Sequence, residues 1–249
     1  MNNFSSSRFC NVMRRDLAEH RRTYFAFFGI LIIAHSLIHF FGNLIGIPHE
    51  RFFVQFFLIL GLFALGSCYA MSLIYAQMDT KERRIASFML PASNFEKALS
   101  RHLLATLGFW LIFALSYLCS EVIQAVYVAV AHGVGEVAKQ SLLANLVQID
   151  IPSQHLLDFV EFAKSLPWML VGVHLFASSW FVLGSAYFRK KAFIKVALIM
   201  LVLNPNVLLS ESILEQSLGI QLAYTLLIVA MSVGVLYLAY RRFCRLQVI

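Results

Sequence analysis

Long apolar runs alternate with short charged clusters along the chain. A helix needs about 20 predominantly apolar residues to cross the hydrocarbon core of a bilayer. Runs that reach this length cover residues 24–44, 52–77, 103–130, 166–188 and 220–240. A sixth run begins near Ala192 and is interrupted by Asn204-Pro205-Asn206, so the sequence leaves open whether this segment crosses fully or is re-entrant. The pattern predicts an all-α, polytopic membrane protein with six transmembrane helices in one domain.

Two further segments show helical periodicity without being transmembrane. In residues 1–22, apolar residues such as Phe9 and Val12 recur at helical spacing among arginines, which predicts an amphipathic elbow helix in the membrane interface. Residues 131–165 form the longest connection between apolar runs. We expect an extracytoplasmic helical segment there, divided by Pro152 into two amphipathic pieces.

Composition and charge support this interpretation. Of the 249 residues, 60% are hydrophobic and 13% charged, and the mean hydropathy is +0.75. A soluble domain of this size cannot hide so much apolar surface. With six spans, all lysines and arginines but Arg51, Lys139 and Lys164 fall on one side, so the positive-inside rule places both termini in the cytoplasm. The net charge of +7 follows from this topology and from contact with anionic lipids, and it does not indicate nucleic-acid binding.

The segment 79–102, between the second and third runs, carries specific local signals. Pro91 ends any helix that precedes it. Ser93 stands three residues before Glu96, which is the spacing of a capping box, so a new helix is expected to begin at Asn94. One interpretation is an ordinary cytoplasmic loop with a short surface helix. The other is a docking surface for a cytoplasmic partner.

In the docking interpretation, three apolar residues anchor the partner and three cations form a polar rim. The proline and the helix cap give the loop a fixed shape. The anchor residues are Phe88, Met89 and Leu90. The rim consists of Arg83, Arg84 and Lys97. The shape residues are Pro91, Ser93 and Glu96.

Three polar residues form a candidate site inside the predicted spans. His35 and His39 are four residues apart and share a helix face. This spacing can hold a metal, but no Cys, Asp or Glu lies nearby in the sequence, so we favour polar packing between helices. Glu121, the one carboxylate within a predicted span, lies about 27 Å along a helix from Leu103, near the far edge of a core of about 30 Å. A structural role at the outer interface is favoured over a proton relay.

Several motifs of catalysis and ligand binding are absent from the sequence. It has no G-x-x-x-x-G-K-[ST], no H-E-x-x-H and no G-x-S-x-G. We therefore expect no P-loop ATP hydrolysis, no catalytic residues and no cofactor or metal.

The four cysteines are Cys10, Cys68, Cys119 and Cys244. They include no CxxC pair, so we expect no disulfide framework. Gly42 and Gly46 form a G-x-x-x-G, a weak signal for close helix contact.

The sequence resembles one known family. The stretch Phe88-Met89-Leu90-Pro91-Ala92-Ser93-Asn94-Phe95-Glu96-Lys97 is similar to the LLLPAS-x-x-EK stretch of ABC-2-like permease proteins from Bacteroidetes. The order of parts also resembles the membrane subunits of ABC transporters of the ABC-2 type. Those subunits have an elbow helix, six spans, a docking loop between spans two and three, and an excursion after span five. The corresponding segments here are about 6–22, 80–101 and 204–219.

The resemblance implies a permease subunit in the bacterial inner membrane that pairs with a separate cytoplasmic ABC ATPase. It further implies two permease copies, identical or different, that export a substrate by alternating access. Lipid, peptide, drug and glycan substrates stay open. The alternative from another class is a non-transporting membrane protein, either an assembly scaffold or an intramembrane enzyme that uses Glu121 and the histidines.

Overall fold

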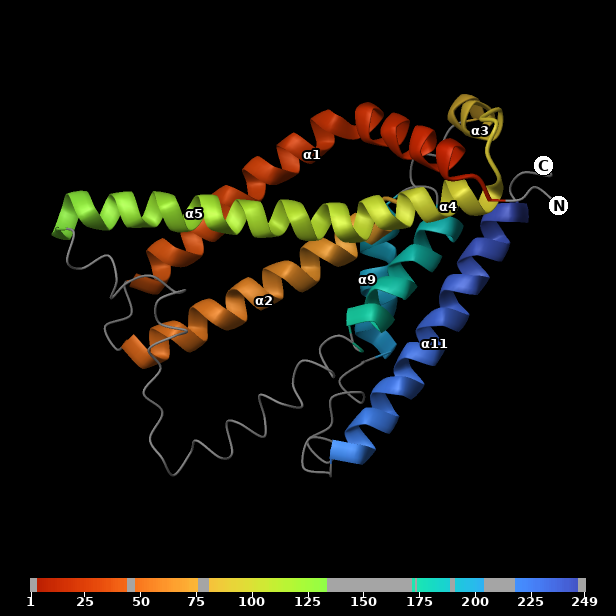
Figure 1. Ribbon diagram of the computed structural model, residues 1–249. Helices are drawn as coiled ribbons and strands as arrows, with labels where there is room; N and C mark the ends of the chain where they lie inside the picture. Colours follow the sequence, from red (N-terminus) through yellow and green to blue (C-terminus); the bar gives the residue numbers. More distant parts are fainter. Residues whose placement is uncertain are drawn as a thin grey trace. The chain divides into compact units, whose positions relative to one another are not determined.

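The computed structural model describes residues 4–43, 48–75, 81–133, 172, 174–188, 191–203 and 218–245 (Figure 1). Within these ranges every regular element is a helix and there is no strand, which confirms the all-α prediction. The elements are α1 (Ser6–Asn43), α2 (Pro48–Ser72), α3 (Lys81–Phe88), α4 (Asn94–Leu103), the π-helix η2 (Leu104–Gly108), α5 (Phe109–His132), α9 (Ala192–Leu203) and α11 (Leu218–Arg245). Residues 174–187 are also helical.

Four helical stretches in the described part of the chain are long and apolar enough to cross a membrane. They are Ser6–Gly42, Val54–Ser72, Asn94–Ala131 and Thr225–Arg245. They correspond to the first, second, third and sixth predicted spans, and they indicate a helical membrane protein. The fourth and fifth predicted spans extend into residues outside the described ranges, so the count of six stays a prediction. The same is true of the predicted outer segment, of which only residues 131–133 are described.

The first helix differs from its prediction. We expected a separate elbow over residues 6–22, but α1 runs without a break from Ser6 to Asn43. No proline or glycine occurs between Ser6 and Gly29, so nothing in the sequence interrupts the helical hydrogen bonds there. A helix of 38 residues is about 57 Å long, whereas the hydrocarbon core is about 30 Å thick. Part of α1 must therefore lie outside the hydrocarbon, and the arginine-rich N-terminal part is the one suited to it.

Helix α4 continues through η2 into α5, so the predicted start of a span at Leu103 is not a break in the helix. The hydroxyl of Thr106 donates to the carbonyl oxygen of His102 at 2.7 Å and approaches that of Leu103 at 3.4 Å. A threonine that bonds back to the preceding turn competes with the backbone and bends helices. This contact lies in the π-helical turn, and such turns occur frequently at functional sites.

The chain divides into two compact units. One comprises Met1–Arg14, Ser67–Thr106 and Pro152–Ile249, and the other comprises Arg15–Gly66 and Leu107–Ile151. Each unit has its own aromatic packing, and the passage from Thr106 to Leu107 falls within η2.

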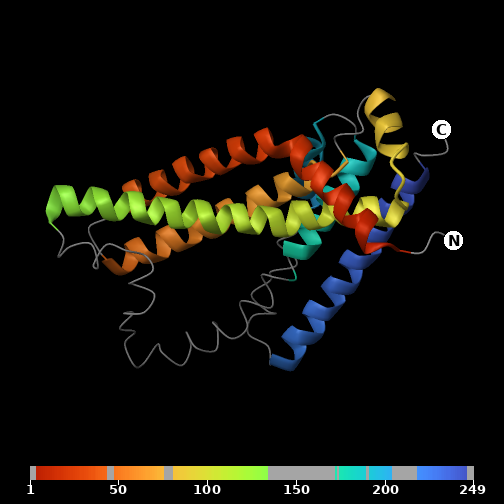
Figure 2. The same cartoon turned by 45° about the horizontal axis from the view of Figure 1, so that its top comes forward.

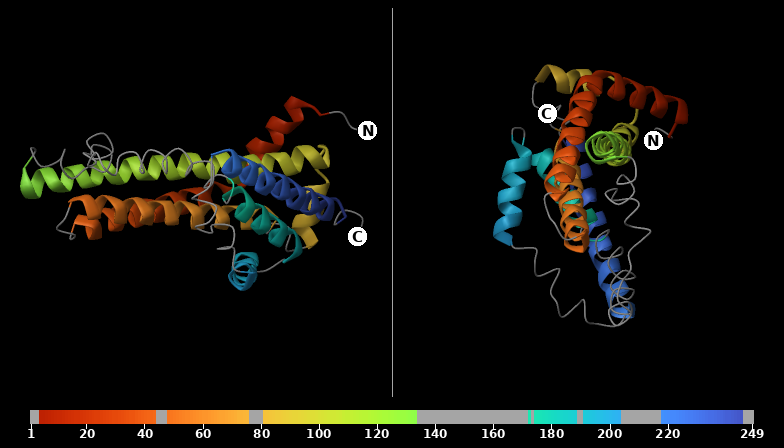
Figure 3. Two further views of the ribbon diagram at one scale, coloured as in Figure 1. Left: turned by 90° about the horizontal axis from the view of Figure 1, so that it is seen from below. Right: turned by 90° about the vertical axis from the view of Figure 1, so that its left-hand side faces the viewer.

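In the first unit, aromatic rings hold the helices together. Tyr75 stacks on Phe243 of α11, with ring centroids 5.2 Å apart, and Phe181 stacks on Phe193 of α9 at 5.3 Å. Figure 3 shows the helix of residues 174–187 and α9 from two further sides. The C-terminal end of α11 lies beside the start of α4 (Figure 2), where the Asn94 amide donates to the Cys244 sulfur at 4.0 Å.

In the second unit, phenylalanines from three helices meet. Phe63 of α2 lies 5.1 Å from Phe113 of α5 between ring centroids, and Phe27 of α1 lies 5.9 Å from Phe109. The ring of Phe109 also lies against Gly66, where an added Cβ would come within 3.0 Å of it. This packing holds α1, α2 and α5 together around the buried histidines described below.

Candidate functional site

The turn between α3 and α4 has the local structure that the sequence predicts. Helix α3 ends at Phe88, three residues before Pro91, and α4 begins at Asn94. The Glu96 N–H donates to the Ser93 hydroxyl at 3.2 Å, and the Ser93 N–H donates to the Glu96 carboxylate at 2.8 Å. Both halves of the capping box are therefore formed. This confirms the predicted helix start.

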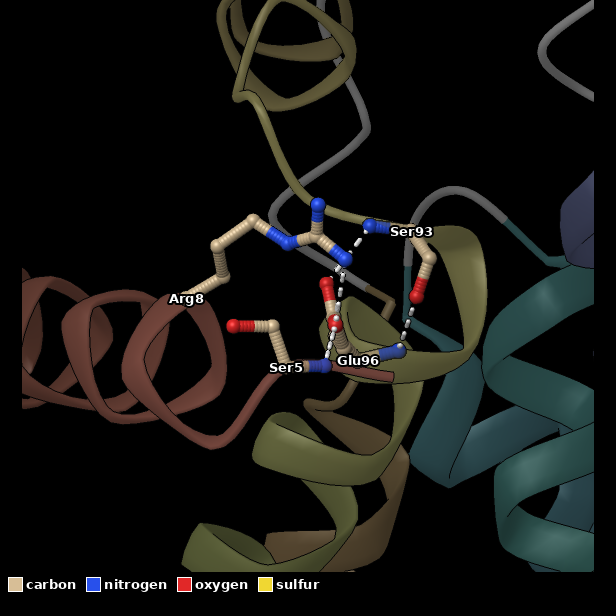
Figure 4. A network of polar contacts seen from close by, with 4 residues as sticks. All are labelled: Ser5, Arg8, Ser93 and Glu96. Carbon is tan, nitrogen blue, oxygen red and sulfur yellow. Dashed lines mark hydrogen bonds and ion pairs between the residues drawn. The ribbon is translucent and has the colours of Figure 1, made fainter. Parts of the chain in front are cut away.

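The second oxygen of the Glu96 carboxylate binds the start of α1. Its Oε1 accepts a hydrogen bond of 2.7 Å from the Ser5 backbone N–H and one of 3.2 Å from the Arg8 guanidinium (Figure 4). The Glu96 side chain is fully buried. One carboxylate thus caps α4 and attaches α1 to it. Sequence reasoning predicted only the cap, because no local signal pairs residues 91 positions apart.

Electrostatics favour a charged Glu96. The apolar part of the 38-residue stretch Asn94–Ala131 follows Arg101, so Glu96 in the first turn of α4 lies outside the spanning part. The hydrogen bond from the Ser5 N–H, helped by those from Ser93 and Arg8, lowers the pKa of Glu96 to about 2 against the opposing effect of burial. The carboxylate is therefore ionised throughout the physiological pH range.

A second polar contact ties α3 to α4. The guanidinium of Arg101 donates to the Ser87 hydroxyl at 2.7 Å, and both side chains are buried. No local pattern in the sequence singles out this pair. Together with the Ser93 cap, it fixes both sides of the turn at Pro91.

The predicted docking residues divide into exposed and buried ones. Met89 is 79% exposed, Pro91 is also exposed, and Leu90 is half-buried. The side chains of Arg83, Arg84 and Phe88 lie outside the described set, so their assignment stays a prediction. Ile85, which the docking set did not include, is exposed on α3.

One of the predicted docking residues needs correction, and another has the shape role predicted for it. Lys97, which we placed on the polar rim, is only 3% exposed, and Glu96 is fully buried. Both lie in the first turn of α4, which is packed against other parts of the first unit. A partner therefore meets neither side chain in this conformation, and Glu96 acts on the shape of the loop from within.

An aromatic cluster lies beside the Glu96 network. Phe4 packs against Phe9 with ring centroids 5.7 Å apart and against Phe95 at 6.3 Å. Phe4 and Phe95 are each about half exposed. These rings add an apolar contact to the polar attachment of the α1 start.

The second candidate site lies among α1, α2 and α5, and the structure brings its three predicted members into one cluster. His35 and His39 are both buried on one face of α1. The Ser116 hydroxyl lies 3.3 Å from Nδ1 of His35, and Nε2 of His39 lies 3.7 Å from Oε1 of Glu121. The same Oε1 accepts a hydrogen bond of 2.6 Å from Tyr117. Sequence reasoning named the histidines and Glu121 but did not show that they meet.

Among the described residues, no group of three or more His, Cys, Asp or Glu side chains has the arrangement to hold a metal ion.

The Gln55 amide of α2 donates to the carbonyl oxygen of His39 at 3.4 Å. Gly42 makes room for that glutamine, because a Cβ at this position would overlap its side chain. The close helix contact expected near the G-x-x-x-G motif therefore exists at Gly42.

Comparisons with known proteins give no relative for this chain. No protein-family model, no curated protein and no solved structure matches it. The function therefore rests on the residues and contacts above.

Proposed function

We propose that this chain is the membrane-spanning permease subunit of an ABC transporter of the ABC-2 type, driven by a separate cytoplasmic ATPase. It works in the bacterial inner membrane as one of two permease copies, with both termini in the cytoplasm, and it exports its substrate. Long apolar helices and the strongly one-sided distribution of cations support the membrane topology. The residues 79–102 are the segment on which the ATPase acts.

The observation that carries this proposal is the double attachment of Glu96. A loop that merely joins two spans does not need a fixed shape. Individual contacts on the protein surface contribute little to stability, so such contacts alone would not fix the loop. Here the carboxylate holds the start of α4 through Ser93 and the start of α1 through Ser5 and Arg8. A displacement of the loop therefore acts directly on two helices, each of which continues into a long apolar stretch.

The exposed residues of the turn suit the contact with the ATPase. Ile85 and Met89 present apolar side chains to the surface, and the Arg101–Ser87 bond holds α3 in place beside them. Exposed apolar residues on a rigid turn are what a docking anchor requires. In this mechanism, closure of the ATPase dimer on ATP pushes the turn, and α1 and α4 carry the displacement into the membrane.

The decisive experiment is co-purification. We expect the tagged, full-length chain to capture a P-loop ATPase that lacks spans of its own and is encoded beside it. Capture should persist in detergent and in nanodiscs. If the ATPase is present at equal abundance and stays entirely in the unbound fraction, the transporter proposal is overturned.

A second candidate function has one observation in its favour. The buried contact of His39 with Glu121 places two titratable groups among apolar helices, as a non-transporting intramembrane enzyme would require. A scaffold or enzyme of this kind needs no ATPase. The co-purification therefore separates the two functions.

A further inference from the structure

Two cations on different helices of the first unit each cover an aromatic ring. The guanidinium carbon of Arg242 on α11 lies 5.0 Å from the ring centroid of Tyr187. The ammonium nitrogen of Lys195 on α9 lies 5.1 Å from the ring centroid of Phe188. Both distances are within the range of a cation–π contact. Because Tyr187 and Phe188 are consecutive, these contacts bring the end of α11 and the start of α9 to the end of the helix of residues 174–187.

These helix ends carry positive charge without negative charge nearby in the sequence. No aspartate or glutamate occurs in residues 162–210 or in residues 216–249. Five cations of the two helix ends form what we call the basic patch, and none of them makes an ion pair with a carboxylate in the described part of the chain. All are exposed except Arg242, which is partly buried. The members of the basic patch are Lys191, Lys195, Arg241, Arg242 and Arg245.

The helix dipoles account for only part of the basic patch. Arg242 and Arg245 lie in the last turn of α11, where cations are favourable. Lys195 lies in the first turn of α9, and Lys191 directly precedes that helix. Cations are unfavourable there, because the N-terminal end of a helix is itself positive. The two lysines therefore add to a positive helix end, and an anion bound at the patch would offset this repulsion.

Exposed apolar residues lie one turn from the cations, toward the middle of each helix. On α11, Leu238 is exposed and precedes Arg242 by four residues, so the two share a helix face. On α9, Leu198 is exposed and follows Lys195 by three residues. The stretch Thr225–Arg245 is apolar enough to cross a membrane, so the cations at its end belong to the membrane interface. A ligand with a negative group above apolar chains matches this order of residues, whereas a free phosphate matches only its charged part.

We propose that the basic patch binds the headgroup of an anionic phospholipid. The planar guanidinium of Arg242 donates to the phosphate oxygens, and Lys195 adds a point charge. The acyl chains lie along Leu238 and Leu198. The aromatic rings beneath the two cations hold them in place before the lipid binds, which lowers the loss of side-chain freedom on binding. A zwitterionic lipid also carries a cationic group that the patch repels, so the site selects lipids with a net negative charge.

The test is native mass spectrometry of the purified full-length chain in detergent, titrated with phosphatidylglycerol or with phosphatidylcholine. We expect the wild type to prefer phosphatidylglycerol. Each cation near an anionic lipid surface strengthens binding about five-fold, so Arg242→Gln combined with Lys195→Gln should weaken binding of phosphatidylglycerol about 25-fold. Binding of phosphatidylcholine should not change. Arg242→Lys keeps the charge but loses the planar group, so its loss should be smaller than that of Arg242→Gln. Inorganic phosphate at equal concentration should not displace the lipid, because it makes no apolar contacts.

A matched control removes two cations outside the patch. Arg21 and Arg22 are exposed on α1, so Arg21→Gln combined with Arg22→Gln changes the net charge by the same amount. This variant should keep the wild-type preference for phosphatidylglycerol. Size-exclusion profiles establish that each variant is folded, and the comparison of the two lipids on the wild type needs no variant.

Three results would overturn the proposal. They are equal affinity of the wild type for both lipids, displacement of phosphatidylglycerol by an equal concentration of inorganic phosphate, and the same loss of binding in both double variants. The measurement needs no ATPase, so its outcome is independent of the transporter proposal.

Discussion

The Ser5 backbone N–H donates a hydrogen bond of 2.7 Å to the buried carboxylate of Glu96, 91 residues further along the chain. The same carboxylate completes the helix cap with Ser93. One oxygen therefore accepts a hydrogen bond from the start of α1, and the other accepts one at the start of α4. A change at Glu96 must affect both helices together.

The first prediction concerns the charge of Glu96. The side-chain amide introduced by Glu96→Gln has one oxygen and one NH₂ group, so one of the two backbone donors, at Ser5 or at Ser93, would face another donor. The bond to Arg8 would also lose its charge assistance. We expect the chain to insert into the membrane, while hydrogen exchange becomes faster in residues 5–12 and in the first turn of α4. Exchange measured by mass spectrometry in nanodiscs tests this.

The exposed Glu19 provides a control for this experiment. Its contact with Arg15 is 3.9 Å long and lies on the surface, where ion pairs contribute little. Glu19→Gln should leave exchange in both regions as in the wild type. Equal exchange of the wild type and Glu96→Gln would show that Glu96 does not hold the start of α1.

The second prediction follows from the lowered pKa of Glu96. A carboxyl group whose pKa is lower in the folded state stabilises that state above its ordinary pKa, and the contribution is lost as the pH falls toward the folded value. The ordinary value is 4.5 and the folded one is about 2. Protection of the Ser5 amide, corrected for the intrinsic exchange rate, should therefore be constant from pH 7 to about pH 5 and fall between pH 4.5 and about 2. Loss of protection already between pH 7 and pH 5 would contradict the ionised carboxylate.

Much of the local structure around Glu96 could be predicted from sequence. Capping depends on residues three apart, and Pro91 blocks the preceding helix by its own geometry, so both effects are visible in a short stretch. The positions of four apolar helices were equally clear, because length and hydropathy decide them. The separate elbow was not predicted correctly, since a change from polar to apolar residues does not by itself interrupt a helix such as α1.

The contacts between distant residues could not be predicted. Nothing near Ser5 indicates a carboxylate partner, and nothing near His39 indicates Glu121. Such pairs depend on how helices pack, which the periodicity of one helix does not specify. Lys97 was misplaced for the same reason: its charge suggested the surface, whereas the packing of α4 buries it. A buried lysine is rare, so burial was not the default expectation.

The third prediction tests the contact of Gly42 with Gln55. In Gly42→Ala the new Cβ would overlap the Gln55 side chain, which also donates to the His39 carbonyl. Overpacking of this kind typically costs about 1–3 kcal/mol. We expect a lower midpoint of thermal unfolding in detergent. Replacing Gln55 by Ala as well should recover part of the loss, since it removes the overlap.

Gly61 of α2 is the matched control for this substitution. An added Cβ at Gly61 meets nothing within 4 Å. Gly61→Ala should therefore leave stability unchanged or raise it by about 0.5–1 kcal/mol, through the helix propensity of alanine. If Gly42→Ala and Gly61→Ala behave alike, the close contact at Gly42 is not important for packing.

The last prediction concerns capture of the ATPase by the turn before α4. The turn is fixed by the Ser93 cap, and Met89 is largely exposed beside it. Truncated anchor residues typically cost more than about 1 kcal/mol each, so Phe88→Ala combined with Leu90→Ala should weaken capture at least about ten-fold. Met89→Ala should weaken it in the same direction. The measurement is co-purification at equal membrane abundance.

Two further variants separate docking from general damage to the fold. Ser93→Ala removes the cap and leaves the anchors, so it should cost about 1 kcal/mol, which corresponds to about five-fold weaker capture. Val130→Ala truncates an apolar residue that is 84% exposed near the end of α5, far along the chain from the turn, and it should leave capture unchanged. Because docking requires both apolar anchors and a fixed shape, the losses should rank with the anchor double variant first, Ser93→Ala second and Val130→Ala indistinguishable from the wild type. Undiminished capture by the anchor double variant would exclude Phe88 and Leu90 as anchors and overturn the docking role proposed for residues 79–102.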